Sequence, residues 1–221
     1  MPHRSLKRIR TTGLLYVLLI CIVNLSMAQD ALKPVDGSSF SYLGSDEVDG
    51  SPYVFESFEK SKLIGTNGSV TEDVMINYNA EIDQMIAKTS ETNYLLLSSY
   101  MYRDIICPSG NYRNMNTVGQ KGYARIIYEG EDLALFEKTI AHRTKPDSNP
   151  YSDIKANYRI RHIQRYYLNV KEELHEIKLK EKSFYDHFPK EEVKKIFKQN
   201  DLKLKNEADL VKFLRLLDSR Y

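Results

Sequence analysis

Residues 60–79 read KSKLIGTNGSVTEDVMINYN, and this stretch decides the fold of the 221-residue chain. Two runs flank Asn67 and Gly68, which both tolerate the positive φ angles of a tight turn between strands. In the second run Val74, Ile76 and Tyr78 alternate with less apolar residues, so they share one face of an extended strand. The stretch therefore predicts a β-hairpin with one strongly apolar face.

The residues after this hairpin continue an up-and-down pattern of short strands. Ile82, Ile86 and the run 94–97 follow turns expected at 79–81 and 90–93. Such closely spaced strands favour an antiparallel meander over βαβ units, which need long crossovers. Four more strands are expected at 123–128, 133–141, 158–168 and 174–179, which brings the total to about eight.

Two segments between these strands are expected to be loops. Residues 107–121 combine Pro108, Gly110 and Gly119 with Asn and Gln, and we expect a long polar loop there. The segment 144–150 contains two Pro and separates the strand pairs. The whole region 51–181 is thus predicted to be an antiparallel β domain, either a curved meander or a partly closed barrel.

The last forty residues change to a helical period, so 182–221 is predicted to be a helical subdomain of two or three short helices. Ser183 to Asp186 resembles a capping box, and Pro189 fits a first helical position. Asn200 is expected to end this helix, and Asn206 to begin the last one. The expected buried positions are Val193, Ile196, Phe197, Leu210, Phe213, Leu214 and Leu217. The fold class is therefore α+β and mainly β.

The first 28 residues have the order of a secretory signal: a basic head, an apolar run and a small-x-small site ending at Ala28. A transmembrane anchor is the main alternative, but the run is shorter than the ~20 residues that a spanning helix needs. A lipoprotein signal is disfavoured because Cys21 follows large apolar residues. We expect export to the periplasm, the outer membrane or the outside of the cell, with 29–50 as a flexible lead-in and no transmembrane span after cleavage.

Cleavage would change the charge and cysteine count of the chain. The full sequence has 32 Lys and Arg against 30 Asp and Glu, and the signal holds four of the basic residues, so 193 residues of net charge −2 would remain. Cys107 would be the single cysteine, expected as a small buried apolar residue beside Ile105 and Ile106. This composition excludes a strongly cationic polyanion binder and a disulfide-stapled mini-protein.

Several segments have a pattern in common with one family: SPYVFE at 51–56, INYN at 76–79, the segment 182–189 and LKNEADLVKFL at 204–214. Together they resemble an uncharacterised family of secreted proteins common in Bacteroidota. The resemblance implies a signal peptide, a β-rich middle and a Lys-rich helical tail, and it implies no catalytic residue.

Motifs for catalysis, metals and cofactors are missing from the sequence. The four histidines after the signal do not occur at metal-ligand spacing, and there is no P-loop, no Gly-x-Ser-x-Gly and no Gly-x-Gly-x-x-Gly. Paired carboxylates occur at expected turns and helix starts, where solvation or capping explains them. We therefore expect no metal, no cofactor and no catalytic residue.

Charge suggests where a partner would bind. Residues 29–110 carry a net charge of −8 and residues 111–221 one of +6. In the expected strand at 158–168, Arg159, Arg161 and Arg165 share a face with Tyr167, a combination that can hold phosphate, carboxylate or sugar. These four residues are the predicted ligand-binding residues, although cross-strand packing also explains them.

The sequence thus favours a non-catalytic cell-envelope or periplasmic protein that acts as a binding or structural module. The expected partner is an envelope protein, a lipid or a glycan, and not a nucleic acid, because export separates the protein from nucleic acids. The alternatives are a hydrolase acting on envelope polymer or peptide, and a small-ligand carrier that uses the cavity of a β-barrel. The oligomeric state is left open.

Overall fold

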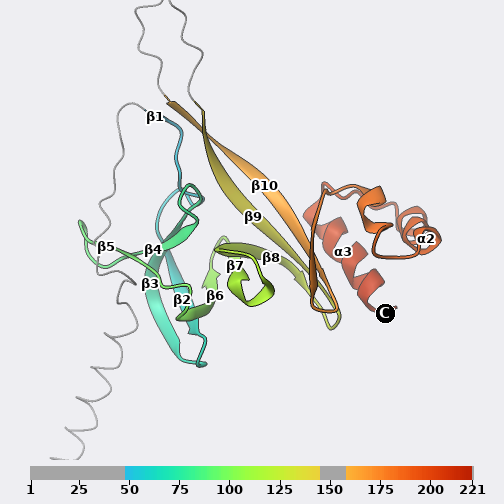
Figure 1. Ribbon diagram of the computed structural model, residues 1–221, viewed down its shortest axis with the longest axis horizontal. Helices are drawn as coiled ribbons and strands as arrows, with labels where there is room; N and C mark the ends of the chain where they lie inside the picture. The colour runs from blue at the N-terminus through green and yellow to red at the C-terminus, as the bar shows by residue number, and fades with distance from the viewer. Residues whose placement is uncertain (1–47, 145–157, 221) are drawn as a thin grey trace, which may run out of the picture.

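The computed structural model describes residues 48–144 and 158–220. The predicted signal peptide, most of the predicted lead-in and nearly all of the predicted loop at 144–150 lie outside the described residues. Figure 1 shows the described part as a large twisted sheet that carries a small helical region at one end.

The described residues contain one open sheet of eleven strands, so the predicted α+β, mainly β class is confirmed. The strands are β1 (Val48–Asp49), β2 (Glu59–Gly65), β3 (Val70–Asn79), β4 (Gln84–Lys88), β5 (Tyr94–Leu96), β6 (Tyr102–Cys107), β7 (Gly110–Asn114), β8 (Tyr123–Glu129), β9 (Leu133–Thr144), β10 (Tyr158–Val170) and β11 (Glu173–Ile177). The expected number of about eight is too low because β1, β6 and β7 were not predicted.

Apart from β1, which pairs with β10 in parallel, the strands form two antiparallel meanders that meet in the middle of the sheet. The order is β1-β10-β9-β8-β7-β6-β2-β3-β4-β5, with β11 also paired to β10, so the join is the pair of β2 and β6. The sheet is open, but it curls: the turn after β3 reaches β9, where the Ala141 amide donates to the Ala80 carbonyl at 3.0 Å. The predicted hairpin at 60–79 is confirmed as β2 and β3, with Gly68 at a φ of 82° in its turn.

The prediction of a long polar loop at 107–121 is wrong. β6 and β7 form a tight hairpin in which Cys107 pairs with Gly110, and a short 3₁₀ helix, η1 (Met115–Val118), follows. The prediction took the polar residues of this segment as a sign of an exposed loop, but Asn114 is buried. It makes hydrogen bonds inside the fold, including one from its side-chain amide nitrogen to the Tyr102 carbonyl at 3.1 Å. A buried Asn is favourable only when such partners are available.

Three clusters of buried side chains pack on the two faces of the sheet. The first lies within the curled half and includes Tyr78, Ile105 and Tyr112. The second joins β8 to β10 with the helices, and the third, around Phe136 and Tyr167, lies on the other face of β9 and β10. These clusters fix the strands that surround the site described below.

The helices at the C-terminal end are a 3₁₀ helix, η2 (Glu181–Phe184), and two α-helices, α2 (Lys190–Asn200) and α3 (Glu207–Asp218). The expected buried positions are correct except that Phe197 is only half-buried. The predicted capping box is wrong, since η2 begins after Lys180 with no side-chain cap, and Pro189 is the N-cap rather than the first helical residue. In the described part of the chain neither helix has the length and apolarity to cross a membrane.

Both ends of α3 are attached to the β8–β9 hairpin. At its start Glu207 receives two hydrogen bonds from the Arg125 guanidinium, the shorter at 2.8 Å. At its end the Asp218 carboxylate accepts hydrogen bonds from the Tyr128 hydroxyl at 2.9 Å and from the Glu131 and Asp132 amides at 3.1 and 3.2 Å. The helix therefore holds the turn that leads out of β8.

Candidate functional site

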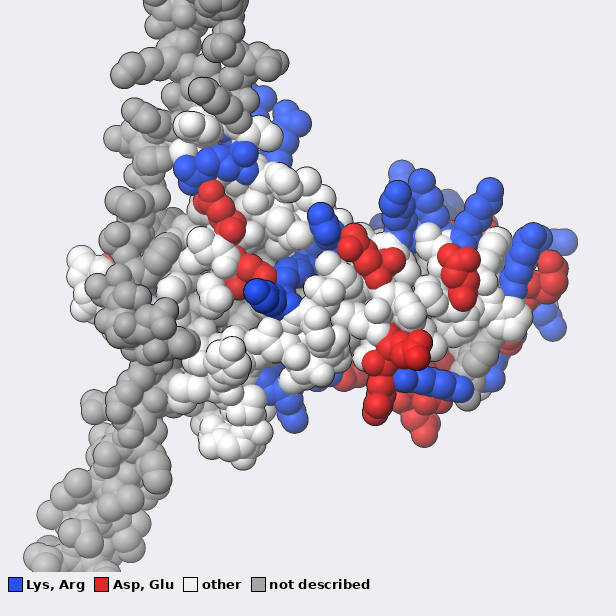
Figure 2. Space-filling model, viewed as in Figure 1, with Lys and Arg blue, Asp and Glu red and all other residues white. Residues whose placement is uncertain are grey.

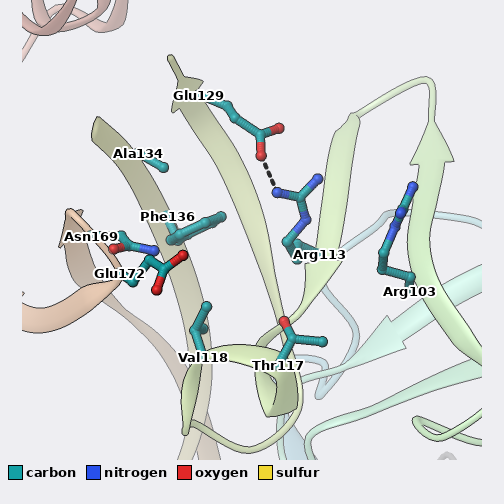
Figure 3. A pocket seen from close by; sticks show the side chains of 9 residues that line it. All are labelled: Arg103, Arg113, Thr117, Val118, Glu129, Ala134, Phe136, Asn169 and Glu172. Atoms are coloured by element: carbon teal, nitrogen blue, oxygen red, sulfur yellow. Dashed lines mark hydrogen bonds and ion pairs between the residues drawn. The ribbon is translucent and has the colours of Figure 1, made fainter. Parts of the chain in front are cut away.

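An open cleft of about 790 Å³ lies on the face of the sheet that carries Phe136, and its size is within the range of small-molecule sites. Its walls come from β6, β7 and η1 on one side and from β8 to β10 and the β10–β11 turn on the other (Figure 3). The lining residues are Arg103, Arg113, Thr117, Val118, Glu129, Ala134, Phe136, Asn169 and Glu172.

Two arginines share one carboxylate in the first wall. Asp104 is only 7% exposed, and its two oxygens accept from Nε of Arg103 at 2.9 Å and from Nε of Arg113 at 2.8 Å. Arg113 also donates to Glu129 across the cleft edge, as Figure 3 shows. Burial disfavours the charge of Arg113, but the hydrogen bonds to Asp104 and Glu129 outweigh it, so the pKa of Arg113 is raised. The guanidinium therefore stays charged and is held in one orientation.

The pairing of β6 and β7 creates this arrangement. Asp104 lies directly opposite Arg113 in the antiparallel register, and opposite charges in such a pair attract. Arg103 is 53% exposed at its side chain, and in the described residues only its Nε has a recorded partner. Its terminal nitrogens are therefore available to an anion that enters the cleft.

The 3₁₀ helix η1 is positioned by Asn114, the last residue of β7. The Asn114 side-chain oxygen accepts from the Asn116 amide at 3.0 Å, and Thr117 donates its hydroxyl to the Asn114 carbonyl at 3.0 Å. Gly119 ends the helix at a φ of 83°, a conformation that favours glycine. This turn brings Thr117 and Val118 to the wall of the cleft.

The floor of the cleft is apolar and its far side is polar. Phe136 is 1% exposed and packs in the cluster that contains Met115 and Tyr167. Asn169 and Glu172 lie on the opposite side of Phe136 from Arg113 (Figure 3). The side-chain oxygen of Asn169 is buried and has no hydrogen-bond partner in the described structure, and such a group costs free energy unless a ligand or water satisfies it.

Glu172 stands in a two-residue turn with an unfavourable backbone. Val170 pairs with Glu173, and the two residues between them, Lys171 and Glu172, have φ angles of 48° and 72°. Such turns favour Asn and Gly, because a side chain at positive φ is crowded by the backbone. A smaller cavity of about 230 Å³ lies beside this turn and shares Glu129, Ala134, Asn169 and Glu172 with the cleft.

The predicted ligand-binding residues on β10 are not gathered in one site. Arg159 is paired with Asp49 at 3.1 Å, Arg165 is 3.6 Å from Glu176, and Arg161 is exposed. Tyr167 is 5% exposed and packs beside Phe136, so its side chain is not available to a ligand next to the arginines. The alternation along the strand predicts all four residues on one face. That face of β10 is exposed at the three arginines and buried at Tyr167.

Two further features, a pair of histidines and a buried cysteine, lie outside the cleft. The rings of His175 and His187 lie 4.3 Å apart, a contact that their sequence spacing did not suggest. Cys107 is buried as expected, and burial raises its pKa to about 11. In residues 48–144 and 158–220 no group of three or more His, Cys, Asp or Glu side chains could hold a metal ion.

The surface charges are more mixed than the sequence suggests. In the view of Figure 2, Lys and Arg lie beside Asp and Glu over the helical end. Ion pairs such as Lys138 with Asp83 and Arg143 with Glu81 join the two parts of the chain that differ in net charge.

Arg103 and Arg113 were not predicted as site residues, and Arg113 was assigned to a loop. The signal was available in Tyr112-Arg113-Asn114, where the buried Tyr112 and Asn114 alternate with Arg113 as on a strand.

Known proteins give no further guide to the cleft. No family model, no curated protein sequence and no solved structure matches the chain.

Proposed function

We propose that the protein is an exported, non-catalytic binding module of the cell envelope or periplasm and that the cleft is its ligand site. The observation that carries the proposal is the pair of arginines held by the buried Asp104 at the cleft wall. A fixed guanidinium loses little freedom when it binds, and its planar set of donors matches an oxyanion. The ligand group that it recognises is a carboxylate or a phosphate.

The carboxylates beside the arginines serve to orient them, which favours binding over hydrolysis. Both oxygens of Asp104 accept from guanidinium groups, and Glu129 accepts from Arg113. A general acid or base needs a free oxygen within reach of the proton that it transfers, which neither oxygen of Asp104 provides. The carrier alternative relied on the cavity of a closed barrel, whereas the sheet is open and the cleft is lined by charged groups.

Export rests on the sequence of residues 1–28, and mass spectrometry of protein purified from its native envelope tests it. We expect an N-terminus at Gln29, with the protein in the envelope or periplasmic fraction. Deletion of residues 1–28 should leave the protein in the cytoplasm. An intact Met1 on protein from the envelope fraction would contradict cleavage.

Binding is tested by calorimetric titration with two simple probes, N-acetyl-alanine for carboxylates and methyl phosphate for phosphates. We expect at least one of them to bind, and Arg103→Gln to weaken that binding by about tenfold, the usual effect of losing one charge-assisted hydrogen bond. Arg103 is half exposed, so its replacement should leave the fold intact.

Arg161→Gln is the matched control, because Arg161 is an exposed arginine of β10 outside the cleft. It should bind the probes like the original protein. An effect of Arg161→Gln with none of Arg103→Gln would move the site to the β10 ribbon, and binding of neither probe would refute the proposal.

A further inference from the structure

The side of the cleft opposite the arginines carries a negative charge that the structure does not neutralise. Glu172 lines the cleft, and within the described residues no ion pair of its side chain is recorded. Arg103 and Arg113 lie across the apolar floor of Phe136 from Glu172 and Asn169 (Figure 3). The cleft therefore has guanidinium donors at one end and, within the described part of the chain, an unpaired carboxylate at the other.

The unpartnered oxygen of Asn169 points to the same kind of ligand. It lies in the lining of the cleft, is buried, and can only accept a hydrogen bond. A hydrogen-bond donor is therefore the complement on this side of the cleft, and the N–H of an ammonium or of an amide supplies one. A purely anionic ligand would offer no such donor.

The backbone of Glu172 gives an independent reason to assign a role to this residue. A φ of 72° is unfavourable for Glu, and glycine would suit the turn better. Backbone strain of this kind is frequent where a side chain is needed for function. Here the strained position is the one that places a carboxylate at the cleft wall.

We infer that the cleft binds a short peptide segment with a free carboxylate and a free ammonium, with the carboxylate at Arg103 and Arg113 and the ammonium at Glu172. The inference rests on the proposed function, since it requires that the arginines hold the anionic group. The volume of about 790 Å³ accepts a dipeptide, and Asn169 accepts one of its N–H groups. A compact aminophosphate would place both charges close together and would bring no amide to Asn169.

The test compares three forms of one ligand: Ala-Ala, N-acetyl-Ala-Ala and Ala-Ala-amide. Calorimetric titration should show Ala-Ala binding at least about tenfold tighter than either blocked form, because each block removes one charge-assisted contact. Glu172→Gln should reduce the affinity for Ala-Ala to that for the N-acetyl form. Glu173→Gln, the neighbouring carboxylate outside the cleft lining, should change nothing.

The outcomes separate this inference from the proposed function. Equal binding of Ala-Ala and N-acetyl-Ala-Ala, with loss in Arg103→Gln, would refute the ammonium site and leave the anion site standing. Binding of phosphoethanolamine in place of Ala-Ala would show an aminophosphate ligand and refute the peptide. If none of these probes bound, both the inference and the proposed function would fall.

Discussion

The carboxylate of Asp218 should be one of the largest single contributors to stability outside the apolar core. It accepts three hydrogen bonds, from the Tyr128 hydroxyl and from the Glu131 and Asp132 amides, at 2.9 to 3.2 Å. A hydrogen bond to a charged group contributes roughly 1.5–3 kcal/mol, and the half-exposed position reduces this. The negative charge at the end of α3 costs about 0.5 kcal/mol against the helix dipole. We therefore expect Asp218→Ala to lower the free energy of unfolding by about 3 kcal/mol.

Urea denaturation followed by circular dichroism measures this change. Glu191→Ala is the control, because Glu191 is an exposed acid at a helix start with one ion pair at 3.6 Å, and it should cost less than about 0.5 kcal/mol. Gly130→Ala is a second probe of the same contact, since a Cβ at Gly130 would overlap the Asp218 carboxylate. The loss of stability caused by Gly130→Ala should be smaller in a protein that already carries Asp218→Ala. A loss below about 1 kcal/mol for Asp218→Ala would refute the reasoning.

Three further predictions concern the strained turn, the histidine pair and the cysteine. The double change Lys171→Asn with Glu172→Gly should raise the free energy of unfolding by about 1 kcal/mol, because both new residues suit positive φ angles. It should also abolish the preference for a ligand with a free ammonium. A lower free energy of unfolding in urea would contradict the strain argument. Burial, and to a smaller extent His175, lower the pKa of His187, so the folded protein binds this proton less readily than the unfolded chain and loses stability as the pH falls below about 6.5. The His187→Asn variant should lose less stability than the original protein between about pH 7.5 and 5.5. An equal loss would contradict this reasoning. Because burial raises the pKa of Cys107 to about 11, a thiol reagent at pH 8 should label the folded protein at least about tenfold more slowly than the urea-unfolded protein, and equal rates would show an accessible thiolate.

Much of the sheet could be predicted from local patterns alone. The Asn67-Gly68 turn and the apolar face of Val74, Ile76 and Tyr78 are signals within one hairpin, and the structure confirms them. The prediction failed where the pattern depends on distant partners. Ile82, expected on a strand, is 42% exposed in the turn after β3, because that turn reaches across to β9.

The cleft could not be predicted because its parts meet only through the sheet topology. Asp104 and Arg113 face each other across a hairpin that the polar sequence concealed. Glu129, at the end of β8, and Glu172, in the β10–β11 turn, come later in the chain. The arginines of β10 were chosen by local alternation, which does not reveal that Tyr167 enters the core. Burial of a polar residue depends on partners that one sequence does not show.

The stability predictions and the proposed site are linked through the β8–β9 turn. Asp218 holds the turn that follows Glu129, and Glu129 in turn accepts from Arg113 at the cleft. Loss of Asp218 should therefore weaken ligand binding as well as stability, although the residue does not line the cleft.

The most direct measurement of the central claim is a titration of isotope-labelled protein with Ala-Ala, followed by NMR of the backbone amides. We predict that the largest shifts fall at Arg103, Arg113, Thr117 and Glu172, which lie on both sides of the cleft. Shifts confined to the ribbon at 159–165, or no shifts at millimolar ligand, would contradict the assignment of the cleft as the ligand site.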